Sequence, residues 1–363
     1  MKPLAIVSSL VTVGVAAGLI GAGMTMLVHL IEHSTTWYFS MFLAVLGASM
    51  WWWLRGRNHS LLHVLVDATA QLIVVGAGAS LGREQAPRQV ASAIAQRVWI
   101  PETYKRHLSI AAAGAGLAAV YNIPIAGALY AIEVLGRKCH PTLVIFAALA
   151  SGIATVTAWP LIGNHAFYSI PDAAMNTTTL LLLLPTMLLG GGLGWVFSGL
   201  AQRQIHRRVS GTWLMLSVPS AVVVVLLVAE VLPAVTGNGQ LVLDLAFHSN
   251  LHSVEAAALL LAKLALTCLC LRAGARGGVL TPSLAVGGAA GAMLAAFVGA
   301  DAVALALFGG AAALAVTQRA PLFAAMMAIE LTHPDPWVVA SMLGFAIPAS
   351  ALLARRQSGQ ARR

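Results

Sequence analysis

The chain has 363 residues, of which 59% are hydrophobic and only 9% charged, and its formal net charge is +9. Soluble domains carry about 25% charged residues, so this composition excludes a soluble protein and predicts an all-α polytopic membrane protein. The basic residues form short clusters between apolar segments, as in cytoplasmic loops, rather than the stripe of a nucleic-acid-binding surface. We therefore expect a multi-pass membrane protein whose surroundings are the lipid bilayer and which binds no nucleic acid.

Apolar segments of two lengths alternate along the chain. Several reach the roughly 20 residues needed to span a bilayer, but 86–98, 123–139 and 320–332 are too short. Short segments interrupted by Gly and Pro are typical of partial helices around a transport site. The segments run approximately over 4–32, 37–54, 61–80, 86–98, 108–120, 123–139, 142–162, 178–202, 212–233, 253–273, 282–299, 302–317, 320–332 and 336–354.

The first apolar segment ends in a motif that also occurs in metalloenzymes. His29-Leu30-Ile31-Glu32-His33 matches the H-x-x-E-H pattern of a class of zinc peptidases. A catalytic zinc needs a third protein ligand, and no second motif supplies it. The motif also borders residues 33–36, which lack Lys and Arg and are expected outside the cell. We therefore predict no metal site, no cofactor and no enzymatic activity.

One carboxylate interrupts the apolar sequence in the stretch Ser80–Pro87. Glu84 lies at membrane depth, where an ionisable side chain is costly and by default functional. Gly82 lets the backbone leave helix geometry, and Pro87 fits the first turn of a helix. Because helix N-termini attract anions, Glu84 is expected at an anion-binding helix start. The alternative is a structural pair of Glu84 with Arg83.

Two parts of the chain resemble each other in sequence. Gly114–Glu133 aligns with Ala311–Glu330, and upstream Gly82–Pro87 aligns with Gly277–Pro282. Chance similarity between Ala- and Gly-rich helices is the alternative to two homologous halves, which are common in transporters. The alignment predicts a first membrane repeat over 1–202, a cytoplasmic linker over 203–211, a second repeat over 212–354 and a basic cytoplasmic tail over 355–363. The identical pairs include Leu117/Leu314, Pro124/Pro321, Ala131/Ala328, Ile132/Ile329 and Glu133/Glu330.

The second half offers backbone groups where the first half offers Glu84. Three glycines in Gly274–Pro282 free the N–H groups around Gly278, Val279 and Leu280 to face a ligand, although they also permit close helix packing. Upstream, Thr236-Gly237-Asn238-Gly239-Gln240 is a polar turn. Asn238 is either an anion ligand or simply a turn residue.

Four further charged residues lie in or at the ends of apolar segments. Asp67 and Lys263 occupy nearly equivalent repeat positions with opposite charge, so a salt bridge between them and separate contacts with the pathway both remain open. Glu133 and Glu330 end matching segments, which favours a structural role such as interfacial hydrogen bonding.

These motifs resemble those of the CLC family of chloride channels and chloride/proton antiporters. Gly82-Arg83-Glu84-Gln85-Ala86-Pro87 is similar to the family's G-R-E-G-P, although Gln85 and Ala86 replace one glycine. The stretches Gly116–Glu133, Gly274–Pro282 and Arg319–Glu330 are similar to the family's later motifs. The motifs follow the family's order from about residue 61 to 354.

The resemblance implies an inverted repeat of many tilted and broken helices, and a homodimer with a separate anion pathway in each subunit. Chloride is the family's usual transported ion. By the resemblance, Glu84 is the external gating and proton-accepting glutamate, and backbone amides bind the anion. The expected anion-binding residues are Gly82, Arg83, Gln85, Gly278, Val279, Leu280 and Asn238.

Some positions depart from the family. The first-half serine loop is not found, and Asn58 or Ser60 are the candidates to replace it. Val134 stands where antiporters carry a second, internal glutamate, and no counterpart of the family's pore tyrosine is found. Passive anion transport is therefore favoured. The alternatives are proton-coupled antiport of chloride or of fluoride, which Thr281 before Pro282 keeps open, and a non-conducting protein on the same scaffold.

Overall fold

The computed structural model describes the backbone of residues 3–34, 36–56, 60–137, 139–248 and 251–360, and their side chains except those of 3, 33, 34 and 352–360. This part of the chain is helical and contains no strand, as expected for an all-α protein. Six of its helices are long and apolar enough to cross a membrane, so the protein is a multi-pass membrane protein. The elements are α1 (Pro3–Ser34), α2 (Trp37–Trp53), α3 (Leu61–Gly76), α4 (Gln85–Ala95), α5 (Glu102–Tyr121), α6 (Pro124–Leu129), η1 (Tyr130–Gly136), α7 (Pro141–Ile162), α8 (Thr177–His206), η2 (Gly211–Trp213), α9 (Leu214–Ala229), η3 (Pro233–Val235), α10 (Gln240–His248), α11 (Ser253–Ala273), α12 (Leu280–Val298), α13 (Ala302–Gln318), α14 (Pro321–Thr332) and α15 (Pro336–Gln360).

The repeat expected from the sequence is visible in two equivalent turns. The C-cap residues that follow α5 and α13, Asn122 and Arg319, both adopt the left-handed conformation, with φ of 57° and 55°. After one further residue, a proline starts the next helix, Pro124 in α6 and Pro321 in α14. Proline suits this position because the N–H group it lacks has no partner within the helix. The same turn therefore occurs at matching positions of both halves.

The matched glutamates Glu133 and Glu330 connect these two turns. Glu330 accepts hydrogen bonds from the N–H groups of Ile125 (2.9 Å) and Ala126 (2.6 Å) in the first turn of α6. Glu133 accepts one from the N–H of Phe323 (2.8 Å) in the first turn of α14. Each carboxylate thus satisfies free N–H groups at a helix start of the other half. The structural role expected for both residues is confirmed.

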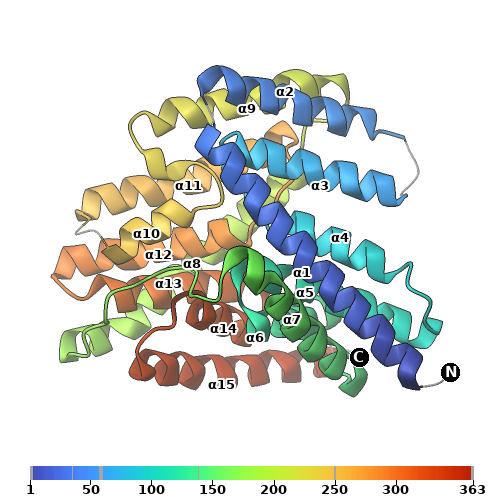
Figure 1. Cartoon of the computed structure of the whole chain (residues 1–363). Helices are drawn as coiled ribbons and strands as arrows, with labels where there is room; N and C mark the ends of the chain where they lie inside the picture. Colours follow the sequence, from blue (N-terminus) through green and yellow to red (C-terminus); the bar gives the residue numbers. More distant parts are fainter. Residues whose placement is uncertain (1–2, 35, 57–59, 138, 249–250, 361–363) are drawn as a thin grey trace.

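The position of α8 bears on where the two halves divide. α8 packs against α11, α12 and α13, as α1 packs against α3, α4 and α5. Its last turn reaches His206, within the stretch expected to be a linker. This packing favours α8 as the first helix of the second half, with the boundary between α7 and α8 rather than at residue 202. Figure 1 shows corresponding helices of the two halves side by side, for example α2 and α9.

The first half has no described counterpart of α10. In the second half, η3 and α10 lie between α9 and α11. In the first half, the described residues between α2 and α3 form only a turn after Trp53. Ser60 caps α3, with its hydroxyl 3.2 Å from the N–H of His63, and Asn58 lies outside the described residues. The described residues between α2 and α3 therefore contain no helix in the place of the first-half serine loop that was not found in the sequence.

Helices α12 and α13 approach each other through glycines. A Cβ atom added to Gly287 would lie 2.3 Å from the carbonyl oxygen of Gly309, and one added to Gly291 would lie 2.1 Å from that of Leu305. Such distances are far below ordinary contact, so only glycine permits this separation of the two helices. Because α12 carries part of the site described below at its N-terminus, its close packing against α13 fixes the position of that site.

Replacing Gly291 by alanine is expected to lower the stability of the protein by about 2 kcal/mol or more, because the added methyl group meets backbone that cannot rotate away. Gly192→Ala in α8 is the matched control, since an added Cβ there has no neighbour within 4 Å. Thermal unfolding of both variants in detergent, followed by intrinsic fluorescence, measures the difference. An equal midpoint for both variants contradicts the glycine-dependent packing.

Candidate functional site

The starts of α4 and α12 meet where the two halves are joined by their backbones. The N–H of Gly82 donates to the carbonyl of Gly278 at 2.8 Å, and the N–H of Gly278 donates to the carbonyl of Gly82 at 2.7 Å. The sequence repeat aligns these two loops, and the structure places them directly against each other. A reciprocal backbone pair fixes both distance and orientation, so the two helix starts are held in one relative geometry.

Glu84 is fully buried beside this backbone pair. It immediately precedes α4 but makes no capping hydrogen bond to that helix. Its carboxylate reaches the start of α12 instead. There Oε1 accepts a hydrogen bond from the N–H of Leu280 (3.1 Å), and Oε2 accepts one from the hydroxyl of Thr281 (3.2 Å). The negative group of one half is therefore bound by a helix N-terminus of the other half, where the free N–H groups attract anions.

Both glycines of the backbone pair are required by the position of this carboxylate. A Cβ atom at Gly278 would lie 1.9 Å from Oε1 of Glu84, and one at Gly82 would lie 2.2 Å from Oε2. Any larger residue at either position would displace the carboxylate from the start of α12. These glycines give the backbone freedom, as expected from the sequence, and they also leave room for the carboxylate of Glu84.

Arg83 follows Gly82 but forms no ion pair with Glu84 in the described part of the chain. Its guanidinium is buried, with Cζ 5.9 Å from the ring centre of Tyr121 and 5.8 Å from that of Phe167. Its Nε and Nη2 atoms have no hydrogen-bond partner among the described residues. The alternative of a purely structural Arg83–Glu84 pair is therefore wrong. Arg83 supplies a buried positive charge near the site without neutralising Glu84 directly.

The other expected residues occupy different places around Glu84. Leu280 provides the N–H group that binds the carboxylate, and Val279 precedes α12 as its N-cap residue. Gln85 is half-buried and lines a cavity of about 610 Å³ together with Arg55, Arg208 and other residues. Because basic residues gather at cytoplasmic membrane ends, we expect this cavity on the cytoplasmic side of Glu84. Gln85 thus faces the approach to the site rather than the carboxylate's binding position.

Asn238 connects to the site through Tyr121. Its Nδ2 donates to the hydroxyl of Tyr121 at 3.4 Å, and its Oδ1 accepts from the N–H of Gln240 at 3.1 Å. The same Asn238 lines a second cavity, of about 370 Å³, with Glu32 and Gly78 among its other lining residues. Asn238 is therefore both a turn residue, as one alternative held, and a lining residue of a cavity near the site.

Lys263 holds the segment that carries Asn238. Its buried Nζ donates to the backbone carbonyls of Val235 (3.1 Å), Thr236 (3.5 Å) and Gly237 (2.6 Å). A buried ammonium without such acceptors would be strongly unfavourable. The salt bridge between Asp67 and Lys263 that the sequence left open is not formed. Lys263 instead binds carbonyls of its own half.

Three residues in contact with the site were not identified from the sequence as its members. Thr281 binds Glu84 through its hydroxyl; the sequence drew attention to it only as the residue before Pro282 that keeps fluoride open, not as a partner of Glu84. Tyr121 lies at the end of α5, inside a recognised motif, and contacts Arg83 and Asn238. Arg88, one turn after Glu84, donates from Nε to the carbonyl of Glu84 (2.9 Å) and from Nη1 to the hydroxyl of Tyr130.

Among the described residues, the histidine motif of the first segment belongs to no group of side chains that could hold a metal ion. His29 Nδ1 lies 3.8 Å from Oε2 of Glu32, and the side chain of His33 lies outside the described residues. His29 and Glu32 border the same cavity as Asn238. This is consistent with a position near one end of the pathway through the protein.

Comparisons with known proteins agree with this architecture. The sequence profile of a family described as voltage gated chloride channel matches residues 53–354. A slow cyanobacterial Cl⁻/H⁺ antiporter has the same fold, with a TM-score of 0.82 and 21% identity over 99% of this chain and 96% of its own. A CLC-type fluoride/proton antiporter gives a TM-score of 0.77 and 22% identity over 98% of this chain and 96% of its own.

A eukaryotic CLC transporter gives a TM-score of 0.70 and 18% identity, over 97% of this chain and 72% of its own. At these identities the structural similarities show a shared fold. The family match, however, spans most of the chain and includes the loops that carry Gly82, Glu84 and Gly278. The chain therefore belongs to the CLC family of voltage-gated chloride channels and related transporters.

Proposed function

We propose that this protein transports anions across the membrane and that Glu84 gates their passage. The observation that carries the proposal is the position of its carboxylate at the start of α12. A group with negative charge already occupies a place built from an N–H donor of Leu280, a hydroxyl donor of Thr281 and two glycines. When Glu84 leaves this place, the same donors are free for a diffusing anion. Glu84 and the anion thus compete for one binding position.

The donors at this position favour moderate anion binding, which suits transport, over very tight anion binding. Its donors are a backbone N–H and a hydroxyl, which carry partial charges, while the buried guanidinium of Arg83 contributes a full charge from further away. Transport requires binding that is strong enough for entry and weak enough for release. Partial charges at a helix start meet this requirement without the tight ion pair that a directly contacting lysine or arginine would form.

Chloride is the proposed ion. The matching family is described as voltage gated chloride channel, and one relative with the same fold is a Cl⁻/H⁺ antiporter. Fluoride is the alternative anion, because another relative is a fluoride/proton antiporter of similar length. The hydroxyl of Thr281 is a strong hydrogen-bond donor for either halide. A direct comparison of the two ions in one flux assay distinguishes them.

Proton coupling separates two versions of the proposal. Passive transport is favoured because Val134 follows Glu133, and both oxygens of Glu133 are used, by the N–H of Phe323 and by the hydroxyl of Ser350. Glu133 is thus used in structural hydrogen bonds, and this helix carries no second carboxylate. Proton-coupled antiport is the second candidate, because the two relatives of similar length to this chain are proton antiporters. A simultaneous proton measurement decides between them.

The wider setting follows from the family. We place the protein in the inner cell membrane as a homodimer with one pathway per subunit, as the resemblance implies. Members of the family are transporters rather than enzymes, and the anion is cargo that needs no cofactor. A non-conducting protein on the same scaffold is the remaining alternative, and the first flux measurement below excludes it or establishes it.

Purified protein in chloride-loaded vesicles is expected to release chloride faster than protein-free vesicles. Glu84→Gln is expected to raise efflux at neutral pH by about tenfold, because a neutral amide competes less well for the donors than a carboxylate does. A chloride electrode and a pH-sensitive dye follow both ions, and Glu102→Gln, at an exposed glutamate, is the control.

No chloride release by the unaltered protein would contradict transport altogether. Equal efflux from the unaltered protein and from Glu84→Gln would contradict gating by Glu84. Proton uptake that accompanies chloride release in the unaltered protein would establish antiport over passive transport.

Thr281→Val is expected to raise the chloride concentration for half-maximal flux by about tenfold when it is combined with Glu84→Gln, because one hydrogen bond to the anion is lost. The Glu84→Gln background matters, since it removes competition by the carboxylate. Thr281→Ser keeps the hydroxyl and is the matched control. If Val and Ser give the same half-maximal concentration, the anion does not bind where the carboxylate of Glu84 lies.

A further inference from the structure

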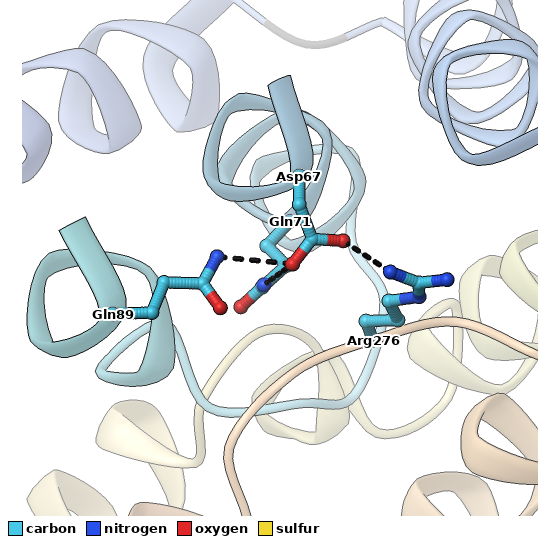
Figure 2. A network of polar contacts seen from close by, with 4 residues as sticks. All are labelled: Asp67, Gln71, Gln89 and Arg276. Carbon is cyan, nitrogen blue, oxygen red and sulfur yellow. Dashed lines mark hydrogen bonds and ion pairs between the residues drawn. The ribbon is translucent and has the colours of Figure 1, made fainter. Parts of the chain in front are cut away.

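A second buried carboxylate, Asp67 of α3, lies at the centre of a polar network between the two halves (Figure 2). Its Oδ1 is 2.7 Å from Nη1 of Arg276. Its Oδ2 accepts hydrogen bonds from Nε2 of Gln71 (2.8 Å) and Nε2 of Gln89 (3.0 Å). All four side chains point toward one another, and both oxygens of the carboxylate are used.

The partners of Asp67 belong to the elements that carry the gate. Gln89 lies in α4, the helix that begins immediately after Glu84. Arg276 lies in the segment before α12, two residues before Gly278, whose backbone pairs with Gly82. Gln71 is in α3, together with Asp67 itself. One carboxylate therefore connects α3 and α4 of the first half with the segment that leads into α12 of the second half.

The contacts of Asp67 suit a fixed connection better than proton transfer. Every neighbouring group in the network donates a hydrogen bond, and one carries a full positive charge, so the network holds the carboxylate in one position. Asp67 also makes no contact with Lys263, the partner that the sequence repeat suggested, because Lys263 is used by the carbonyls of residues 235–237.

The ion pair lies at the cytoplasmic approach to the gate. Asp67 and Arg276 line the same cavity of about 610 Å³ as Gln85 and Gly277. The side chain of Asp67 is 10% exposed and that of Arg276 is 31% exposed. Partial burial makes such a pair stronger than a surface ion pair, and loss of one partner leaves the other charge unpaired in the protein. The geometry of the gate loops therefore depends on both residues.

We propose that Asp67 is a positioning residue of the gate: through Gln89 and Arg276 it holds the starts of α4 and α12 at the spacing that lets Glu84 reach Leu280 and Thr281. Asp67 does not touch Glu84 or the anion, and acts only through these two elements. The inference rests on the proposed gating by Glu84. It predicts that without the connection the carboxylate of Glu84 no longer blocks the anion site.

A double-mutant cycle between Asp67 and Glu84 tests this directly. Chloride efflux from vesicles is measured at neutral pH for the unaltered protein, Asp67→Asn, Glu84→Gln and the double variant. Asp67→Asn alone is expected to raise efflux to within about threefold of Glu84→Gln, and the double variant should not exceed Glu84→Gln. Glu102→Gln, at the exposed pair with Lys105, is the control and should leave efflux unchanged.

Arg276 provides a second arm that does not depend on the folding of Asp67→Asn. Arg276→Gln should raise chloride efflux as much as Asp67→Asn does. Arg276→Lys keeps the positive charge, so its rise in efflux should be at most half of the rise that Arg276→Gln gives. Thermal unfolding in detergent confirms that each variant is folded. A substitution that only lowers stability would lower efflux both in the parent protein and in the Glu84→Gln protein. Glu84→Gln would then still raise efflux relative to the protein without it.

Two results would overturn the inference while leaving gating intact. One is a large effect of Glu84→Gln that persists unchanged in the Asp67→Asn and Arg276→Gln backgrounds. The other is equal efflux from Arg276→Lys and Arg276→Gln. If Glu84→Gln itself leaves efflux unchanged in the parent protein, the proposed gating fails instead, so the two failures are distinguishable.

Discussion

The central interaction of this protein is the hydrogen bonding of one carboxylate to a helix start of the opposite half. Glu84 is buried and would be costly there without the N–H of Leu280 and the hydroxyl of Thr281. These donors are within reach only because Gly82 and Gly278 pair through their backbones and have no side chains. The repeat architecture, the close helix packing behind α12 and the short helices at membrane depth all serve to bring these two loops together.

Much of this arrangement could be predicted from the sequence. Glycine, proline and a single charge identify the loop around Glu84, and the alignment of two segments predicts its partner loop. Side-chain contacts between the halves could not be predicted in the same way, because repeat symmetry matches positions but does not say which residues touch. Asp67 and Lys263 illustrate this: they match in sequence, yet one binds Arg276 and the other binds backbone carbonyls. Thr281 was noticed in the sequence for its place before Pro282, but its contact with Glu84 was not predicted.

The two halves share a backbone plan but differ in chemistry, so the surroundings of Glu84 are asymmetric. The second half keeps η3 and α10, which place Asn238 near the site, while the first half has only a short connection between α2 and α3. A cavity with several arginines therefore opens toward Gln85 from the cytoplasmic side. Anions from that side meet a broad basic approach, and then the narrow position that Glu84 occupies.

The most direct measurement is a structure of the Glu84→Gln variant with bromide, which is located by its anomalous scattering. The account predicts bromide within hydrogen-bond distance of the N–H of Leu280 and the hydroxyl of Thr281, in the place of the carboxylate. Bromide bound elsewhere in the protein, with the start of α12 still covered by residue 84 at saturating bromide, would contradict the claim that gate and anion share one binding position.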